Sequence, residues 1–369
     1  MSSKNFKPTL LVLAPYPNKD NLNDGFIQRV NKMDEFMEGI KRVYIQVSLK
    51  SFTRKEKIYY GTDVVSYKIN FLLHWYLLLG YCMRANLIYA HTIYNLVWLK
   101  YFFNFIKCPI ILDVHGTVPE EIAMSGNSKR ANEYNSIERN CFKNISTAIF
   151  VTESMSNHYL KKYPSFKFNS VKYGIIPDHI KKENLVVSSE KLHGLKKNLN
   201  ISDNDVVVIY SGGLHIWQNI DEMLSLISEK KSDENVVYIF LVSDKEKMHE
   251  MINNYSLGDK RIILDSVHPS ELKFYYSISH YGFVLRDDCV VNRVANPTKL
   301  IEYLYYGLTP IVKLEEIGDF KAFGYNFISR EAYLNETLTS DKNQRNQNVV
   351  DDLFSSYSDS QIKELFKNI

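Results

Sequence analysis

The stretch NPTKLIEYLYYGLTPIV, residues 296–312, decides how the second half of the chain folds. Asn296 is a good N-cap, and Pro297 suits the first helical position because its missing N–H is not needed there. Gly307 is typical of the residue that ends a helix, and the apolar run Thr309–Val312 then predicts a strand. The stretch therefore predicts a helix that starts at Pro297, ends just before Gly307 and leads directly into a buried strand.

Strands and helices alternate on both sides of this stretch. In the second half, strand-like runs fall at Val206–Tyr210, Val236–Val242, Arg261–Val267, Tyr281–Arg286 and Thr309–Val312. In the first half they fall at Thr9–Ala14, Val43–Ser48, Val64–Ile69, Leu87–His91, Ile110–His115, Ala148–Thr152 and Val171–Ile175. Short, continuous apolar runs are typical of parallel strands buried on both faces. We therefore predict an α/β chain with two Rossmann-like βαβ domains that face each other across a cleft.

A polar, lysine-rich segment divides the two arrays of strands. We predict an N-terminal domain over residues 1–177, a linker over 178–200 and a C-terminal domain over 201–345, with a helical tail over 346–369 that packs back on the first domain. Two domains suit the length, because one hydrophobic core rarely grows beyond about 250–300 residues. Parallel sheets bind ligands outside the carboxyl ends of their strands, so we expect functional residues just after strands.

The composition is that of an ordinary globular protein. Hydrophobic residues make up 45% and charged residues 24%, which excludes an intrinsically disordered chain. The four cysteines are scattered, which excludes a disulfide framework and a cysteine zinc site and fits a reducing compartment. The longest apolar run, Ile69–Tyr81, has thirteen residues, whereas a membrane-spanning helix needs ~20. No signal peptide is visible, and we expect a cytoplasmic protein.

The charge is divided unevenly along the chain. Residues 1–177 carry a net +10 and residues 178–369 a net −7, which together give the overall +3. The basic half indicates an anionic partner, such as nucleic acid, an anionic membrane surface or a phosphorylated ligand. The chain lacks a basic element interleaved with aromatic residues, which argues against nucleic acid. The stretch Trp98–Lys107 suits the interface of the inner face of the plasma membrane, and a core helix between two strands explains it at least as well.

Two loops of the second domain have features that suit phosphate groups. A helix that begins near Thr298 presents free N–H groups and the positive end of its dipole, and Lys299 adds a full charge. Glu302 lies one turn further along the same face, where a carboxylate can accept hydrogen bonds from a ribose diol. Gly212 and Gly213 follow a strand and precede a helix, so backbone N–H groups there can point at a ligand. The alternative is an ordinary capped helix with a solvated Glu–Lys pair.

Further candidates follow other strands. His115 and His91 end strands of the first domain, where a side chain can reach a ligand, although a histidine in that position more often has a structural role. Gly25 closes the long polar loop Pro15–Phe26, which can line a cleft or be a plain surface connection. Arg286 ends a strand of the second domain, and arginine binds phosphate in a bidentate manner.

Together these residues resemble the GT-B retaining glycosyltransferases of the glycosyl transferases group 1, or family 4, type. The resemblance covers nearly the whole chain. In the second domain it rests on NPTKLIEYL at residues 296–304, on Gly307 and on the loop Tyr210–Gly213. In the first domain it rests on Gly25, Asp113-Val114-His115-Gly116, Glu138 and Tyr173–Pro177.

The resemblance implies that the second domain binds a UDP- or GDP-linked sugar. Glu302 would hold the ribose, and His115 would touch the donor sugar. The acceptor would lie on the first domain, near Gly25 and His91. No metal and no other cofactor is implied, because cationic side chains and helix ends take the metal's place. The donor-binding residues would be Gly212, Gly213, Gln218, Asn296, Thr298, Lys299 and Glu302.

Two positions depart from the family's pattern. Val294 stands eight residues before Glu302, where the family often has the first glutamate of an E-x7-E motif. Leu214 or His215, together with Gln218, stands where the family often has an arginine and a lysine after the glycine loop.

Because of these departures, other cations must neutralise the charge of the diphosphate. Our hypothesis is that Arg286 and Lys299, with Arg293, supply that charge. Glycosyl transfer builds negative charge on the departing diphosphate, so stabilising the leaving group is the main catalytic task. We therefore name His115, Lys299 and Arg286 as the catalytic residues.

The resemblance thus implies a retaining, metal-independent glycosyltransferase. It would move a sugar from a nucleotide diphosphate sugar to a saccharide or lipid-linked saccharide acceptor in bacterial surface polysaccharide synthesis, and the basic first half adds the expectation of peripheral association with an anionic membrane. One alternative is a catalytically degenerate paralogue that binds a partner transferase, which would bind no nucleotide. The other is a sugar-nucleotide epimerase, which would form product without an acceptor.

Overall fold

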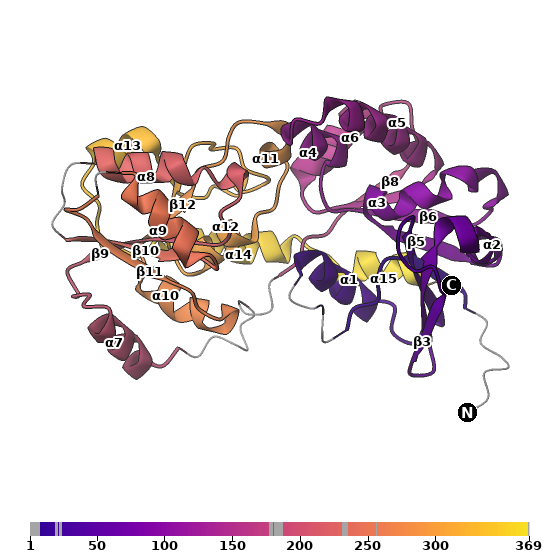
Figure 1. Cartoon of the computed structure of the whole chain (residues 1–369), viewed down its shortest axis with the longest axis horizontal. Helices are drawn as coiled ribbons and strands as arrows, with labels where there is room; N and C mark the ends of the chain where they lie inside the picture. The colour runs from indigo at the N-terminus through magenta and orange to yellow at the C-terminus, as the bar shows by residue number, and fades with distance from the viewer. Residues whose placement is uncertain are drawn as a thin grey trace. The chain divides into compact units, whose positions relative to one another are not determined.

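A computed structural model of the chain describes residues 8–18, 21, 24–176, 180, 187–230, 235–255, 257–367 and 369. The chain divides into two compact units. Unit one comprises residues 1–175 and 357–369, and unit two comprises residues 176–356. Figure 1 labels many of the elements of both.

Unit one is built on an eight-stranded sheet in the order β3-β4-β2-β1-β5-β6-β7-β8. Neighbouring strands are parallel except β3 and β4, which are antiparallel. The central strands β1, β5, β6 and β7 are buried at every residue, which is why they form continuous apolar runs in the sequence. The strands are β1 (Leu10–Leu13), β2 (Arg42–Ser48), β3 (Glu56–Tyr60), β4 (Val64–Asn70), β5 (Leu87–His91), β6 (Ile110–Val114), β7 (Thr147–Phe150) and β8 (Asn169–Lys172).

Helices from both ends of the chain cover this sheet. Asp24 caps α1, because its side chain accepts a hydrogen bond from the backbone N–H of Phe26. The last helix, α15, buries Ile362 and Phe366 in the same apolar core as β1 and α1 (Figure 1). The helices are α1 (Gly25–Glu35), α2 (Phe71–Cys82), α3 (Thr92–Leu96), α4 (Val118–Met124), α5 (Ser128–Asn144), α6 (Glu153–Lys162) and α15 (Asp359–Phe366), with 3-10 turns η2 (Val97–Tyr101) and η3 (Phe103–Phe105).

Unit two is built on a six-stranded, fully parallel sheet in the order β11-β10-β9-β12-β13-β14. Its strands are β9 (Val206–Ser211), β10 (Val236–Leu241), β11 (Arg261–Asp265), β12 (Tyr281–Val284), β13 (Thr309–Val312) and β14 (Ile328–Ser329). Its helices are α7 (Ser189–Asn198), α8 (Ile220–Glu229), α9 (Lys245–Asn253), α10 (Leu272–Ile278), α11 (Val290–Arg293), α12 (Thr298–Tyr305), α13 (Arg330–Asn335) and α14 (Gln344–Ser355), with 3-10 turns η6 (Ile216–Gln218) and η7 (Pro269–Glu271).

The structure differs from the predicted boundaries at both ends of unit two. The predicted linker, residues 178–200, contains the helix α7, while residues 177–179 and 181–186 lie outside the described residues. The predicted tail, residues 346–369, is divided, because α14 belongs to unit two and only α15 belongs to unit one. Asn346 explains the first placement: its side-chain amide donates to the carbonyls of Leu308 and Asn326, which fixes α14 on unit two.

Two other segments also differ from expectation. The edge strand β3 was not predicted, because its residues are largely exposed and the run EKIYY lacks the apolar continuity of the buried strands. Residues 98–107 form the turns η2 and η3, not a core helix. Within the part of the chain that the structure describes, no helix is both long and apolar enough to span a membrane. Residues 19, 20, 22 and 23 of the predicted Pro15–Phe26 loop lie outside the described residues.

Candidate functional site

Unit two contains a cavity of about 340 Å³ at the carboxyl edge of its sheet. Loops that follow β9, β10 and β11 form one wall, and α10 and the start of α12 form the other. This is the edge at which parallel α/β sheets bind ligands. The lining residues are Ser211, Gly212, Leu241, Val242, Ser243, Ser266, Val267, Leu272, Tyr276, Thr298, Lys299 and Glu302.

The start of α12 brings the predicted phosphate-binding residues into this cavity. The helix begins at Thr298, and its N-cap is Pro297, not Asn296 as we predicted. Asn296 lies one residue before the N-cap. Gly307 adopts a left-handed conformation with φ +69° just beyond the helix, as the sequence predicts. The helix start therefore points its free N–H groups and its dipole toward the cavity.

Lys299 is the cation of the cavity. Its Nζ lies 3.8 Å from the centroid of the Tyr210 ring and donates a hydrogen bond to Oε1 of Gln218 at 3.3 Å. Burial, and to a lesser extent the nearby charge of Arg286, together lower the pKa of Lys299 to about 7. A bound anion would reverse this shift. The environment of Lys299 therefore favours an anionic ligand in the cavity.

Glu302 is buried, with 7% of its surface exposed, which contradicts the alternative of a solvated Glu–Lys pair. The hydroxyl of Tyr276 donates to its Oε2 at 2.7 Å. The same hydroxyl lies 2.8 Å from Oγ of Ser211, so a short chain of hydrogen bonds orients the carboxylate. One carboxylate oxygen is thereby fixed by the protein, in a cavity that a ligand can enter.

The glycine loop after β9 leaves room for Lys299. Gly212 has φ +135°, and a Cβ atom at this position would lie 3.0 Å from Nζ of Lys299. Any side chain there would be strained and would displace the lysine. At Gly213 a Cβ would lie 3.0 Å from the ring of His215, and the carbonyl of Gly213 accepts a hydrogen bond from Tyr210 at 2.6 Å.

The two arginines that we expected to neutralise a diphosphate lie in different environments. Arg286 follows β12 and donates to Oδ1 of Asn292 at 3.2 Å, and burial lowers its pKa. The charge of Arg286 contributes to the lowered pKa of Lys299, so the two cations lie close enough to influence each other. Arg293 is exposed and forms an ion pair with Asp288. Neither arginine is among the described residues that line the cavity.

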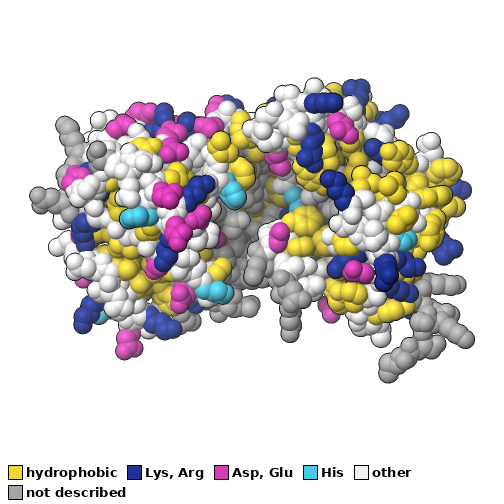
Figure 2. Space-filling model, in the orientation of Figure 1, with side chains coloured by type: hydrophobic (Ala, Val, Ile, Leu, Met, Phe, Trp, Pro, Cys, Tyr) yellow, Lys and Arg dark blue, Asp and Glu magenta, His cyan; other side chains and the backbone are white. Residues whose placement is uncertain are grey.

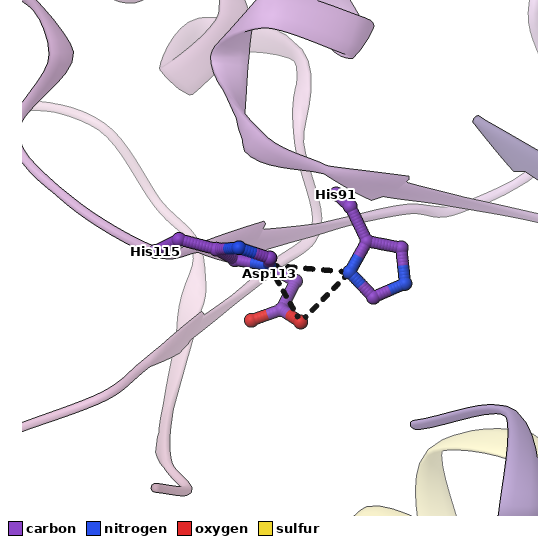
Figure 3. A group of neighbouring side chains, drawn as sticks. All are labelled: His91, Asp113 and His115. Carbon is purple, nitrogen blue, oxygen red and sulfur yellow. Dashed lines mark hydrogen bonds and ion pairs between the residues drawn. The ribbon is translucent and has the colours of Figure 1, made fainter. Parts of the chain in front are cut away.

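Unit one contains a second polar cluster, at the carboxyl ends of β5 and β6, around Asp113 (Figure 3). Asp113 is fully buried and pairs with Arg29 at 2.6 Å. Its Oδ2 lies 3.2 Å from Nδ1 of His91 and 3.3 Å from Nε2 of His115. The hydroxyl of Tyr89 donates to the same oxygen at 3.1 Å. His91 and His115 thus share one carboxylate oxygen.

Within this cluster, the positive charge of Arg29 balances the negative charge of Asp113. Burial raises the pKa of Asp113, but Arg29 and His115 outweigh that effect and hold it well below its usual value. Burial lowers the pKa of His115 to about 4 and also lowers the pKa of His91. At neutral pH the cluster is therefore an ion pair with two neutral imidazoles. His91, Asp113 and His115 lie close enough together to hold a metal ion, but Arg29 already matches the carboxylate's charge.

Gly25 is the first residue of α1, and a Cβ atom there would meet no atom within 4 Å. The ring of the next residue, Phe26, lies 6.1 Å from that of His91 and 5.2 Å from that of His115. The predicted acceptor-side residues therefore gather around one end of α1, within unit one.

Sequence reasoning missed several residues of the two sites. Ser243 follows the predicted strand Val236–Val242, so the rule that ligands bind after strands could have found it. Ser266 lies inside the predicted strand Arg261–Val267, which in the structure ends at Asp265. Tyr276 comes from α10 and meets Glu302 only in the folded chain, and no local pattern indicates it. Arg29 meets Asp113 across 84 residues and is equally invisible in the sequence.

Comparison with known proteins supports this architecture. A scan for known protein families finds no match, and a search of curated proteins finds none. Among solved structures, Anabaena HepE in complex with UDP-glucose matches with a TM-score of 0.65 at 12% identity, over 98% of this chain and 99% of that chain. The chain has the GT-B fold. The predicted fold class is therefore confirmed.

Two further structures share the GT-B fold over their whole length. A trehalose-6-phosphate structure from E. coli, bound with UDP-2-fluoro glucose, matches with a TM-score of 0.63 at 13% identity, over 97% of this chain and 98% of that chain. Sucrose-phosphate synthase from Thermosynechococcus elongatus matches with a TM-score of 0.61 at 12% identity, over 98% of this chain and 97% of that chain.

Proposed function

We propose that this protein is a glycosyltransferase that binds a nucleoside diphosphate sugar in the cavity of unit two. One observation carries the proposal: a helix start, a cation of lowered pKa and an oriented, buried carboxylate line a single cavity at the ligand-binding edge of the sheet. The GT-B fold supports it, because proteins with this fold have been solved with UDP-glucose and UDP-2-fluoro glucose.

The roles of the residues follow from their chemistry. The start of α12 and Lys299 would hold the diphosphate, and Glu302 would accept hydrogen bonds from the ribose diol. As the sugar leaves, negative charge grows on the diphosphate, and Lys299 would become fully protonated and stabilise it. Arg286, close enough to influence Lys299, would add to the same field. We keep His115 as a third catalytic residue, acting on the donor sugar.

Several finer statements belong to this proposal. The donor is UDP-linked rather than GDP-linked, by analogy with the ligands of the similar structures. Transfer retains the anomeric configuration. It needs no metal, because cationic side chains and a helix start stabilise the leaving group. The acceptor is a saccharide or a lipid-linked saccharide, bound near Gly25 and His91, and the product serves bacterial surface polysaccharide synthesis. No other cofactor takes part.

The structure gives reasons to prefer a transferase to the alternatives. Among the described residues that line the cavity, Glu302 supplies the only carboxylate, whereas epimerisation needs additional acid–base groups. A degenerate, partner-binding paralogue has no need of an open cavity in which a buried carboxylate is oriented by Tyr276.

The test is release of UDP from UDP-glucose in the presence of EDTA and a panel of saccharide acceptors. We expect acceptor-dependent release that Lys299→Met abolishes, while the matched control Lys321→Met, an exposed lysine of the same unit, keeps it. Product formed without an acceptor would support an epimerase instead. Binding of UDP without any turnover across the panel would contradict the proposal.

A further inference from the structure

One helix of unit one exposes apolar side chains. The helix α2, Phe71–Cys82, contains no Asp, Glu, Lys or Arg, yet only Leu78 and Cys82 among its side chains are buried. Leu72 is 69% exposed, Leu73 53%, Trp75 46% and Tyr76 57%. Soluble proteins rarely expose contiguous apolar patches of this kind unless the patch binds something.

The turns after α3 extend this surface. Tyr101 in η2 is 62% exposed and Phe105 in η3 is 57% exposed. The ring of Phe71 lies 5.3 Å from that of Trp98 and 5.9 Å from that of Tyr101, so α2 and η2 pack against each other through aromatic side chains. We call the exposed side chains of α2, η2 and η3 the aromatic face.

A groove of about 560 Å³ runs through the aromatic face. Its walls include Phe71, Leu72 and Trp75 from α2 and Trp98 and Tyr101 from η2. Among the described residues that line it, Lys100 and Glu133 are the only charged ones. The Nζ of Lys100 lies 4.9 Å from the centroid of the Tyr101 ring, at the border between the apolar wall and the solvent.

Basic residues flank the aromatic face. Residues 50–107, which contain it, hold eight lysines and arginines against two acidic residues, a net charge of +6. Arg84 follows α2 directly and Lys107 follows η3, and both are exposed. Figure 2 shows hydrophobic side chains gathered over the end of the unit where Figure 1 labels α2, with Lys and Arg side chains among them.

We propose that the aromatic face docks unit one on the surface of an anionic phospholipid bilayer. Trp and Tyr prefer the bilayer interface, because one end of each ring system is apolar and the other is polar. Leu72 and Leu73 would enter the acyl region, while Lys100, Arg84 and Lys107 would meet the lipid phosphates. The aromatic composition and the excess of positive charge together favour this occupant over a protein partner. The proposal does not depend on donor binding in unit two.

The first test is flotation of the full chain with phosphatidylcholine vesicles and with vesicles of equal parts phosphatidylcholine and phosphatidylglycerol. We expect flotation with the anionic vesicles only, and about tenfold weaker binding for Leu72→Ser. The control Leu160→Ser, which changes a leucine on α6 that is 43% exposed, should bind as the wild type does. Equal loss in both variants, or no flotation with anionic vesicles, would overturn the proposal.

A second measurement reports the site directly. The chain has three tryptophans, of which Trp75 and Trp98 lie on the aromatic face. In Trp217→Phe, tryptophan fluorescence then comes from these two residues alone, and brominated anionic lipid should quench it. Absence of quenching in vesicle-bound protein would overturn the proposal. So would a concentration-dependent dimer that Leu72→Ser dissociates, because the face would then bind a second copy. Both measurements are made without nucleotide, so their failure would leave the proposed donor site untouched.

Discussion

The cavity of unit two and the Asp113 cluster of unit one occupy equivalent places, at the carboxyl ends of parallel strands, but their charges are arranged differently. The charge of Asp113 is balanced within the protein by Arg29 at 2.6 Å, and two histidines that are neutral at neutral pH contact the same carboxylate. Lys299 instead contacts an amide oxygen and a tyrosine ring, and burial lowers its pKa to about 7. The comparison indicates that the Asp113 cluster stabilises unit one, whereas the environment of Lys299 favours an anionic ligand.

The largest effect should come from breaking the balanced cluster. Arg29→Met would leave Asp113 buried without its cation, which costs about 3–5 kcal/mol of the free energy of unfolding. Urea denaturation followed by fluorescence would measure the loss. The double variant Arg29→Met/Asp113→Leu should recover much of it, and Lys32→Met on the same helix should change little. A fall of less than about 1 kcal/mol would show that the pair does not stabilise unit one.

The next effect concerns catalysis. Lys299→Met keeps the aliphatic contact with Tyr210 but removes the cation, and kcat should fall by about 10²–10³-fold, as when a group that stabilises a developing anion is lost. Circular dichroism and urea denaturation should show an unchanged fold. A kcat near that of the wild type would remove Lys299 from the catalytic machinery.

Acid should lower the free energy of unfolding by a smaller amount, through the Asp113 cluster. The pKa of His115 falls from 6.5 to about 4 on folding because of burial, so the unfolded chain binds the proton more readily between these values. Stability should therefore fall as the pH drops from 6.5 to 4, by at most about 3 kcal/mol. His115→Gln should reduce this slope in urea denaturation at several pH values. An unchanged slope would show that His115 is not the titrating group.

The smallest effect tests the orientation of Glu302. Tyr276→Phe removes the hydrogen bond to Glu302 at 2.7 Å and the one between the tyrosine hydroxyl and Ser211 at 2.8 Å. The loss of the bond to Glu302 is worth about 0.5–1.5 kcal/mol. We expect UDP to bind about three- to tenfold more weakly, with a smaller change than in Glu302→Gln. Calorimetry would measure both variants beside Tyr305→Phe, which changes a more exposed tyrosine on α12 as the control. A loss in Tyr276→Phe that exceeds the loss in Glu302→Gln would mean that the tyrosine acts on something other than the carboxylate.

The sequence predicts the fold well because most central strands are buried on both faces and therefore appear as short apolar runs. It does not reveal β3, whose exposed edge position removes that signal. In the site, Thr298, Lys299, Glu302 and Gly212 are predictable because one helix start and one glycine loop carry them. Tyr276, Ser211 and Arg29 act through contacts between distant segments, which depend on how the elements pack.

The central claim is that the unit-two cavity binds a nucleotide sugar through Lys299. Calorimetric titration of UDP-glucose and of GDP-mannose, with EDTA at pH 6, 7 and 8, tests it most directly. We predict that UDP-glucose binds saturably and GDP-mannose does not, and that the binding weakens above pH 7, since the lysine must then take up a proton. The heat should depend on the buffer, and Lys299→Met should bind weakly at every pH. Absence of binding for both donors, or equal affinity in the wild type and Lys299→Met, would contradict the account.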